Sequence, residues 1–181
     1  MHFLKYFCIK ALRHDLINKF LYNHTKELPK LKKIILNFGS KTTGMKNLAA
    51  NLLALELITN QKGILTTTKH SNIILKIRKG NPTGCKVTLR GSNMFHFLSK
   101  TLIEIFPKVK DFKGLTLTKK MKKNVFSYEL HETFSFHELE EHYYLFHNLP
   151  KLDVTVVTDS KIKEELVFIL KSLQIPFKRN N

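Results

Sequence analysis

Two segments of the chain alternate apolar and polar residues with a period of two, and this pattern constrains the fold more than any other feature. They are LKKIILNF (31–38) and GCKVTLRG (84–91). Successive side chains of a strand point to opposite faces of a sheet, so each segment predicts a strand with one apolar face. The apolar positions are Ile34, Leu36, Phe38, Val87 and Leu89. The opposite face carries Lys33, Asn37, Lys86, Thr88 and Arg90, together with the apolar Ile35.

Other segments supply the remaining elements. Residues 64–69, 125–134 and 153–158 have strand character, and apolar residues at helical spacing predict helices over 3–22, 48–59, 92–106 and 160–173. Asp159 or Ser160 can cap the last helix. Strands with one apolar and one polar face predict an α+β fold. In such a fold, helices pack on one face of a mainly antiparallel sheet and the other face stays open to solvent. We expect one domain over residues 1–181.

The charge of the chain points to a polyanionic partner. The sequence holds 31 Lys and Arg against 14 Asp and Glu, a formal net charge of +17. This excess lies in residues 1–128, with 25 basic and 5 acidic residues, whereas residues 129–181 hold 6 basic and 9 acidic residues. A sheet face of cations, hydroxyls and an amide suits a sugar-phosphate backbone better than a small apolar ligand. A basic surface of no particular function is the alternative.

Several classes of site are disfavoured. Cys8 and Cys85 stand far apart, so they form no metal-binding spacing and no disulfide framework. The longest apolar stretch, 48–58, is too short and too polar to span a membrane. The basic start of the chain could be a transit peptide, but a structural amphipathic helix explains it as well. We expect no cofactor and no metal.

The stretch KIRKGNPTGCKVTLRG (76–91) could be a phosphate cradle or a hairpin. A phosphate-binding P-loop needs Gly-Lys-Ser/Thr between a strand and a helix, whereas Cys85 and Val87 flank Lys86 here and a strand follows. A nucleotide enzyme is therefore disfavoured. The glycines and the proline instead predict a projecting basic hairpin near 76–86.

The stretch HELEEH (137–142) superficially resembles a zinc-protease helix. That motif needs histidines four residues apart on one helix face, whereas His137 and His142 are five apart and point about 140° away from each other. A polar helix or turn explains the segment.

Taken together, the segments resemble those of a known family, the universal large-subunit ribosomal protein five (L-five) family. The resemblance runs in order along nearly the whole chain. Its matching segments are LPKLKKIILNFG (28–39), ITNQK (58–62), KIRKGNPTGCKVTLRG (76–91), FPKVKDFKGL (106–115), LDVTVVT (152–158) and IPFKR (175–179).

The resemblance implies a non-enzymatic protein of the ribosomal central protuberance that attaches 5S rRNA to the large subunit. By motif, Asn37, Gln61 and Thr88 match positions that contact 5S rRNA. Lys33 and Arg90 join them through their place on the polar face, and Lys62 and Lys86 complete the predicted rRNA-binding set. Other implied partners are the large-subunit rRNA and further central-protuberance proteins.

Two more contacts follow from the resemblance. The turn from Arg78 to Gly84 matches the loop that reaches P-site tRNA. Its residues are Arg78, Lys79, Gly80, Asn81, Pro82, Thr83 and Gly84. Residues near the bridge to the small-subunit head protein S-thirteen are Lys110, Asp111, Phe112 and Lys113. We also expect a mobile basic loop near 113–124.

Composition and departures from the family indicate an organellar member. Lys outnumbers Arg by 27 to 4, which is typical of an AT-rich coding genome such as a mitochondrial one. Residues 116–128 lack the Gly-Arg-Gly-Asn-Tyr element of the family, and the segment 137–150 is longer and more aromatic. The N-terminus aligns without an extension. We therefore expect a mitochondrial ribosomal protein encoded in the organelle.

Three alternatives remain open. A family member in a ribosome lacking 5S rRNA would bind other rRNA or protein through the same face. A phosphate-handling enzyme would use Gly80–Lys86, but it lacks the hydroxyl for magnesium. A membrane-surface protein is disfavoured by the polar sheet face.

Overall fold

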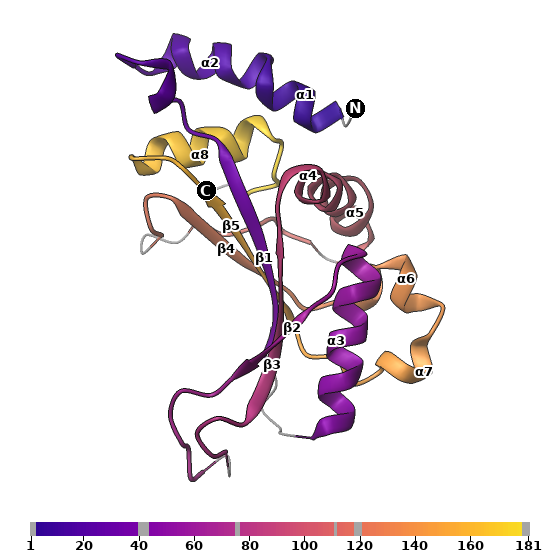
Figure 1. The fold of residues 1–181 in the computed structure, drawn as a ribbon. Coiled ribbons are helices and arrows are strands. Elements are labelled where there is room, and N and C mark those ends of the chain that lie inside the picture. Colours follow the sequence, from indigo (N-terminus) through magenta and orange to yellow (C-terminus); the bar gives the residue numbers. More distant parts are fainter. Residues whose placement is uncertain (1–2, 40–43, 75–76, 111, 118–120, 179–181) are drawn as a thin grey trace. The chain divides into compact units, whose positions relative to one another are not determined.

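The computed structural model describes residues 3–39, 44–74, 77–110, 112–117 and 121–178. The strands are β1 (Leu31–Gly39), β2 (Ile64–Thr67), β3 (Pro82–Leu89), β4 (Val125–Leu130) and β5 (Leu152–Thr158). They form one sheet in the order β2-β3-β1-β5-β4, and β2 pairs antiparallel with β3. Figure 1 shows the α+β arrangement that the alternating segments predict.

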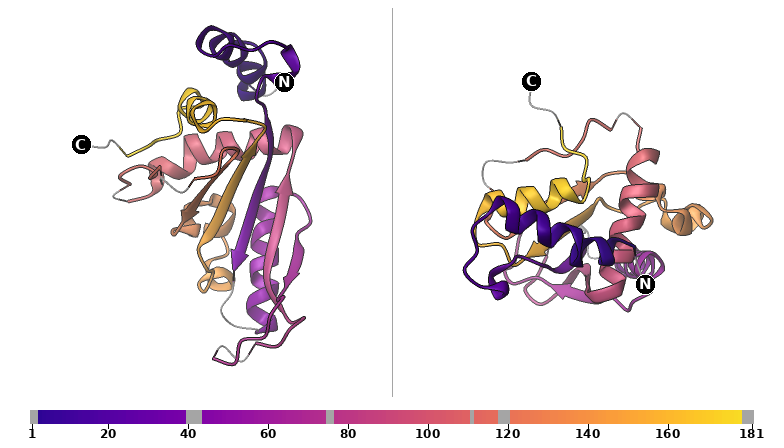
Figure 2. Two further views of the ribbon diagram at one scale, coloured as in Figure 1. Left: turned by 90° about the vertical axis from the view of Figure 1, so that its left-hand side faces the viewer. Right: turned by 90° about the horizontal axis from the view of Figure 1, so that it is seen from above.

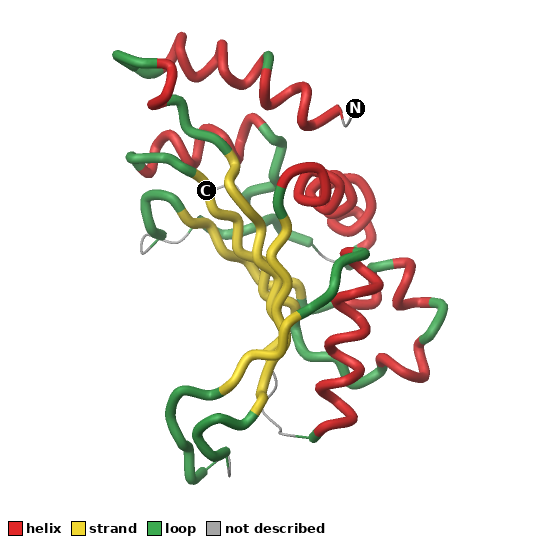
Figure 3. The backbone as a smooth tube through the Cα atoms, in the orientation of Figure 1, coloured by secondary structure: helices red, strands yellow, loops and turns green. Residues whose placement is uncertain are grey.

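The helical elements lie between the strands in the sequence. The α-helices are α1 (Phe3–Ile9), α2 (Ala11–Lys19), α3 (Met45–Thr59), α4 (Gly91–Lys100), α5 (Phe106–Lys108), α6 (His137–Glu140), α7 (Tyr143–Phe146) and α8 (Lys163–Ser172). A π-helical turn, η2 (Thr101–Ile105), joins α4 to α5, and two 3-10 turns are η1 (Thr25–Glu27) and η3 (Thr133–Ser135). Figure 3 shows these helices against the strands and loops.

The chain is divided into two compact units whose boundaries fall inside or at the ends of strands. Unit 1 comprises Met1–Ile34, Arg90–Ser127 and Thr155–Asn181, and unit 2 comprises Ile35–Leu89 and Tyr128–Val154. Because β1, β4 and β5 run from one unit into the other, one domain over 1–181 stays our proposal.

Unit 1 is held together by contacts between its N-terminal segment and α8. Leu12 and Leu16 of α2 are buried, and Phe20 meets Phe168 of α8 edge to face at 5.9 Å between ring centroids. The buried Glu165 carboxylate accepts a hydrogen bond from the Tyr22 hydroxyl at 3.2 Å. Burial and this carboxylate raise the pKa of Tyr22 to about 12, so the phenol stays a donor at neutral pH.

Unit 2 is built on the packing of α3 against β3. Leu48, Leu55 and Ile58 of α3 are buried, and the Cys85 thiol lies 3.5 Å from the Leu48 carbonyl oxygen. The left view of Figure 2 shows α3 running along β3. Helices α6 and α7 contact α3, so all three helices of this unit gather on one side of its strands.

The structure corrects three details of the sequence prediction. The helix predicted over 3–22 is interrupted at Lys10. The strand predicted over 125–134 ends at Leu130. Neither Asp159 nor Ser160 caps α8. The Glu165 carboxylate instead accepts hydrogen bonds from the N–H groups of Lys161 and Ile162, at 3.0 and 3.4 Å.

Candidate nucleic-acid interface

One face of unit 2 carries three of the predicted rRNA-binding residues on neighbouring strands. Along β3, Cys85, Val87 and Leu89 are buried, while Lys86 is exposed and Thr88 is half-buried. Along β1, the half-buried Asn37 lies between buried Leu36 and Phe38. Because α3 packs on the buried side, these polar residues point to the opposite side. We call this side of β1, β2 and β3 the open face of unit 2.

Gln61, which follows the C-terminal end of α3, contacts the backbone of β3. Its Nε2 donates a hydrogen bond to the Thr88 carbonyl oxygen at 3.3 Å. Gln61 and Thr88 are 27 residues apart in the sequence, and each was predicted from a different family motif. The structure thus brings two of the motif-derived positions into direct contact.

The turn that carries Gln61 is fixed by local hydrogen bonds. Asn60 ends α3 in the left-handed conformation with φ of 51°, which asparagine tolerates better than most residues. The Thr59 hydroxyl donates to the Leu55 carbonyl oxygen at 2.6 Å. The Gly63 N–H donates to the Glu56 carboxylate at 3.2 Å. The exposed Gln61 and Lys62 are therefore presented by an ordered helix end.

Sequence reasoning missed the contribution of β2 to the open face. The antiparallel register sets Ile64 opposite Lys86 and Thr66 opposite Gly84. Opposed residues share a face, so Ile64, which is 64% exposed, adds apolar surface beside the lysine. The sequence predicts a strand over 64–69, but it does not give the register that sets Ile64 beside Lys86 of β3.

Gly84 allows the three strands of the open face to approach closely. A Cβ atom on Gly84 would lie 2.8 Å from the Phe38 carbonyl oxygen and 2.8 Å from the Thr66 hydroxyl oxygen. Both distances are shorter than real Cβ atoms show, so a side chain here would push the strands apart. The glycine of GCKVTLRG therefore has a packing role that fixes where Asn37 and Lys86 lie.

The hairpin between β2 and β3 differs from its predicted bounds. Pro82, Thr83 and Gly84 belong to β3 and not to the turn. Proline has no backbone N–H to donate to a neighbouring strand, but it is tolerated as the first residue of a strand. The connecting loop is residues 68–81. Thr68 closes it, since its N–H donates to the Asn81 carbonyl oxygen at 3.0 Å and its hydroxyl to the Arg78 carbonyl oxygen at 2.8 Å.

The loop 68–81 presents cations without acidic neighbours in the sequence. Arg78 and Lys79 are exposed, and Gly80 turns the chain with φ of +89°. The sequence between Glu56 and Glu104 contains no Asp or Glu. Lys76, also predicted to be part of this hairpin, lies outside the described residues. Figure 3 shows the loop extending beyond the paired strands of the hairpin.

Lys33 and Arg90, the other two predicted rRNA-binding residues, belong to unit 1. Lys33 is half-buried on β1, and Arg90 is exposed where the chain enters α4. Lys33 belongs to β1, whereas Arg90 directly follows β3, and their contact with rRNA stays a prediction.

The predicted bridge segment also lies in unit 1. Lys110 and Lys113 are exposed, the Phe112 ring stacks on Phe106 at 5.0 Å, and Asp111 lies outside the described residues. Gly114 follows with φ of +89° and packs against the backbone of Phe177 and Lys178. The Lys178 N–H donates to the carbonyl oxygen of the buried Leu115 at 3.0 Å, which anchors the start of the 113–124 segment.

The described residues offer no centre for metal or thiol chemistry. No group of three or more His, Cys, Asp or Glu within them could hold a metal ion. His137 instead faces Glu140 and Glu141, at 3.8 and 3.6 Å. Burial raises the pKa of the Cys8 thiol to about 11 and also raises that of Cys85, which disfavours a reactive thiolate. No helix in the described ranges is long and apolar enough to cross a membrane.

Comparison with known proteins decides between the remaining classes. The model of the C-terminus of the ribosomal L-five protein family matches residues 82–177. The chain is 40% identical over 181 residues to the large ribosomal subunit protein uL5m of Reclinomonas americana, covering 99% of this chain and 100% of that protein. The chain belongs to the uL5 family.

Other relatives come from bacteria and algae. The chain is 35% identical over 173 residues to the large ribosomal subunit protein uL5 of Malacoplasma penetrans, covering 93% of this chain and 90% of that protein. It is 33% identical over 177 residues to uL5c of Oedogonium cardiacum, covering 97% of both. As a uL5 protein it is a structural constituent of the large ribosomal subunit and not an enzyme, which confirms the resemblance found in the sequence.

Proposed function

We propose that this uL5 protein binds 5S rRNA in the central protuberance through the open face of unit 2. The observation that carries the proposal is the hydrogen bond from Gln61 to the Thr88 carbonyl, which joins two motif positions beside Asn37 and Lys86. The amide, the hydroxyl and the ammonium group there can hydrogen-bond to phosphates and 2′-hydroxyls. The sequence of residues 57–103, which supplies Gln61, Lys62, Lys86 and Thr88, contains no acidic residue to repel a phosphate backbone.

We further propose that the loop 68–81 contacts P-site tRNA and that Lys110–Lys113 lie near the small-subunit head protein S-thirteen. We also propose a mitochondrial ribosome as the site of action and a gene within the organelle, supported by the similarity to uL5m of Reclinomonas americana and by the lysine-rich composition.

Thr88→Val tests the 5S rRNA proposal at a single hydroxyl. Valine keeps the β-branched shape, and the Thr88 hydroxyl has no hydrogen-bond partner among the described residues. Losing one hydrogen bond to RNA costs about 0.5–1.5 kcal/mol, so the Kd for 5S rRNA should rise roughly 2- to 10-fold while the melting temperature is unchanged. Filter binding and thermal melting measure the two quantities.

Thr155→Val is the matched control for Thr88→Val. Thr155 is also a half-buried strand threonine, but its hydroxyl pairs with Ser127 at 3.1 Å in unit 1. We expect this control to leave RNA affinity unchanged. Equal effects of both variants on affinity would show that Thr88 has no specific part in binding.

Removing the loop tests the division of labour between the open face and the hairpin. Residues 69–80 are replaced by Asn-Gly, a two-residue turn that suits the pair formed by Thr68 and Asn81. The paired strands then keep a tight connection, so the open face should be unchanged. The affinity for 5S rRNA should therefore stay within about 2-fold of that of the parent chain, a difference of ~0.4 kcal/mol in binding free energy. Assembled ribosomes should retain P-site tRNA less well. Loss of 5S rRNA with normal tRNA retention would assign the loop to the 5S rRNA site.

A further inference from the structure

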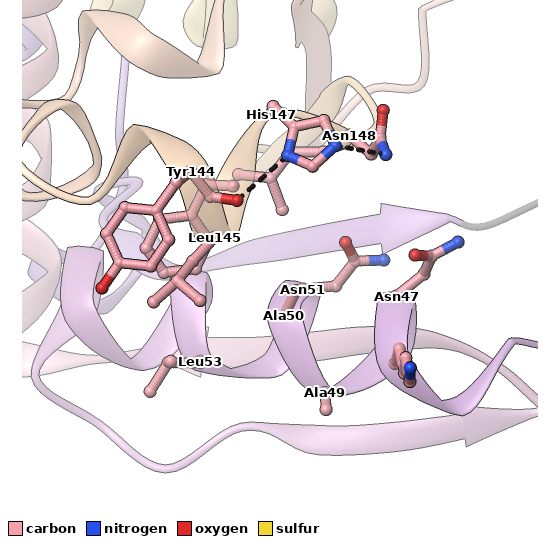
Figure 4. Close-up of a pocket in the computed structure, with 12 residues that line it drawn as sticks. Asn47, Ala49, Ala50, Asn51, Leu53, Tyr144, Leu145, His147 and Asn148 are labelled. Atoms are coloured by element: carbon pink, nitrogen blue, oxygen red, sulfur yellow. Dashed lines mark hydrogen bonds between the residues drawn. The ribbon is translucent and has the colours of Figure 1, made fainter.

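A groove in unit 2 lies between α3 and α7, on the helical side of the unit and not on the open face. It has a volume of about 530 Å³. Small residues of α3, Ala49 and Ala50, line it together with Leu53, Tyr144 and Leu145. The last three side chains are 44%, 71% and 47% exposed, so this α3–α7 groove is an apolar surface open to solvent. Figure 4 shows the two walls facing each other.

The groove contains a buried hydrogen-bond donor without an acceptor. Asn51 is 1% exposed, and its Nδ2 has no partner among the described residues. Figure 4 shows its amide rising from α3 toward the segment that carries His147 and Asn148. An unpaired buried amide is costly, and native proteins seldom leave one. The donor therefore calls for an acceptor that an occupant of the groove would supply.

The chain beside the groove has the opposite charge to the rest of the protein. Residues 124–150 contain no Lys or Arg and five Glu, within a chain of net charge +17. Glu140 is the last residue of α6 and Glu141 follows it, and both are exposed, whereas Lys46 lines the groove near the start of α3. This acidic segment would repel a phosphate backbone and attract a basic peptide.

We propose that the α3–α7 groove docks an extended basic segment of a neighbouring large-subunit protein. One large apolar side chain of that segment would fill the space between Leu53 and Tyr144. A backbone carbonyl would accept the hydrogen bond from Asn51, and lysines or arginines would pair with Glu140 and Glu141. The proposal rests on membership of the large subunit and is independent of 5S rRNA binding.

Direct coupling of carboxylates to amines identifies the occupant. Intact large subunits containing the full chain are treated with a carbodiimide, which joins only groups already in contact, and the joined peptides are identified by mass spectrometry. We expect Glu140 or Glu141 to be joined to a lysine of another ribosomal protein. Carboxylates that stay unjoined to any other protein, or ultraviolet cross-links from Tyr144 to rRNA, would overturn the proposal.

A peptide of about 15 residues around the joined lysine is then titrated against the isolated full chain. Asn51→Leu keeps the approximate size of the side chain, removes the donor and adds no charge, so the Kd should rise roughly 10-fold. Leu53→Ser, at an exposed position, should weaken binding similarly and tests the groove even if Asn51→Leu fails to fold. Ile103→Ser, at an exposed apolar site in unit 1, is the matched control. Affinity unchanged by Leu53→Ser would contradict the assignment.

Discussion

Gly114→Ala is expected to lower the free energy of unfolding by roughly 2–5 kcal/mol, the largest single-residue effect on stability that we predict. Two physical costs combine at this position. The φ of +89° disfavours a side chain, and a Cβ atom would lie 2.6 Å from the Lys178 nitrogen and 2.7 Å from the Phe177 carbonyl carbon. Both neighbours are backbone atoms and cannot rotate away. Denaturant titration measures the loss.

Two other glycines separate these costs. Gly80 has the same φ of +89°, but its Cβ would meet nothing within 4 Å, so Gly80→Ala should cost only about 1 kcal/mol of strain. Gly84 has no strained φ, so Gly84→Ala should cost about 1–3 kcal/mol from overpacking alone. A Gly114→Ala variant no less stable than Gly80→Ala would show that the C-terminal segment is not packed on Gly114.

A combined change of the open face should produce the largest loss of RNA binding. The triple variant Asn37→Ala, Lys86→Ala and Thr88→Val removes an amide, a cation and a hydroxyl from neighbouring strands. Their summed loss of about 2–4 kcal/mol corresponds to a Kd for 5S rRNA raised on the order of 100-fold. Removing one phosphate-facing lysine should also lower the salt slope of binding by roughly one unit. Filter binding at several salt concentrations measures both.

The triple variant should keep the fold because none of its side chains belongs to the buried core. Its matched control is Lys171→Ala with Thr155→Val, which removes a cation and a hydroxyl from unit 1. We expect this control to bind 5S rRNA like the parent chain. A similar loss in both variants would mean that net charge, and not the open face, governs binding.

The strands that carry the candidate site could be predicted from the sequence because their signal is local. The two-residue period of 31–38 and 84–91 directly reports which residues face the core, and β1 and β3 follow it. The pairing of Ile64 with Lys86 could not be read in this way, because register depends on contacts between distant segments.

Some of the sequence predictions that were wrong concern features that depend on contacts between distant segments. Asp159 resembles a helix cap in the sequence, but in the structure its carboxylate pairs with Lys32 at 2.7 Å, and Glu165 takes the capping role. The helix is interrupted at Lys10, where the sequence contains no glycine or proline that would predict a break. Pro82 suggested a turn, yet it begins β3, where a proline is tolerated. The hydrogen bond from Gln61 to Thr88 joins residues whose proximity only the folded chain reveals.

The most direct measurement is to identify the RNA that touches β3 in assembled ribosomes. Purified large subunits are irradiated with ultraviolet light, the peptide containing residues 84–91 is isolated, and the RNA joined to it is sequenced. We expect this peptide to be joined to 5S rRNA. Cross-links only to the large-subunit rRNA or to protein would contradict it and would assign the open face to another partner.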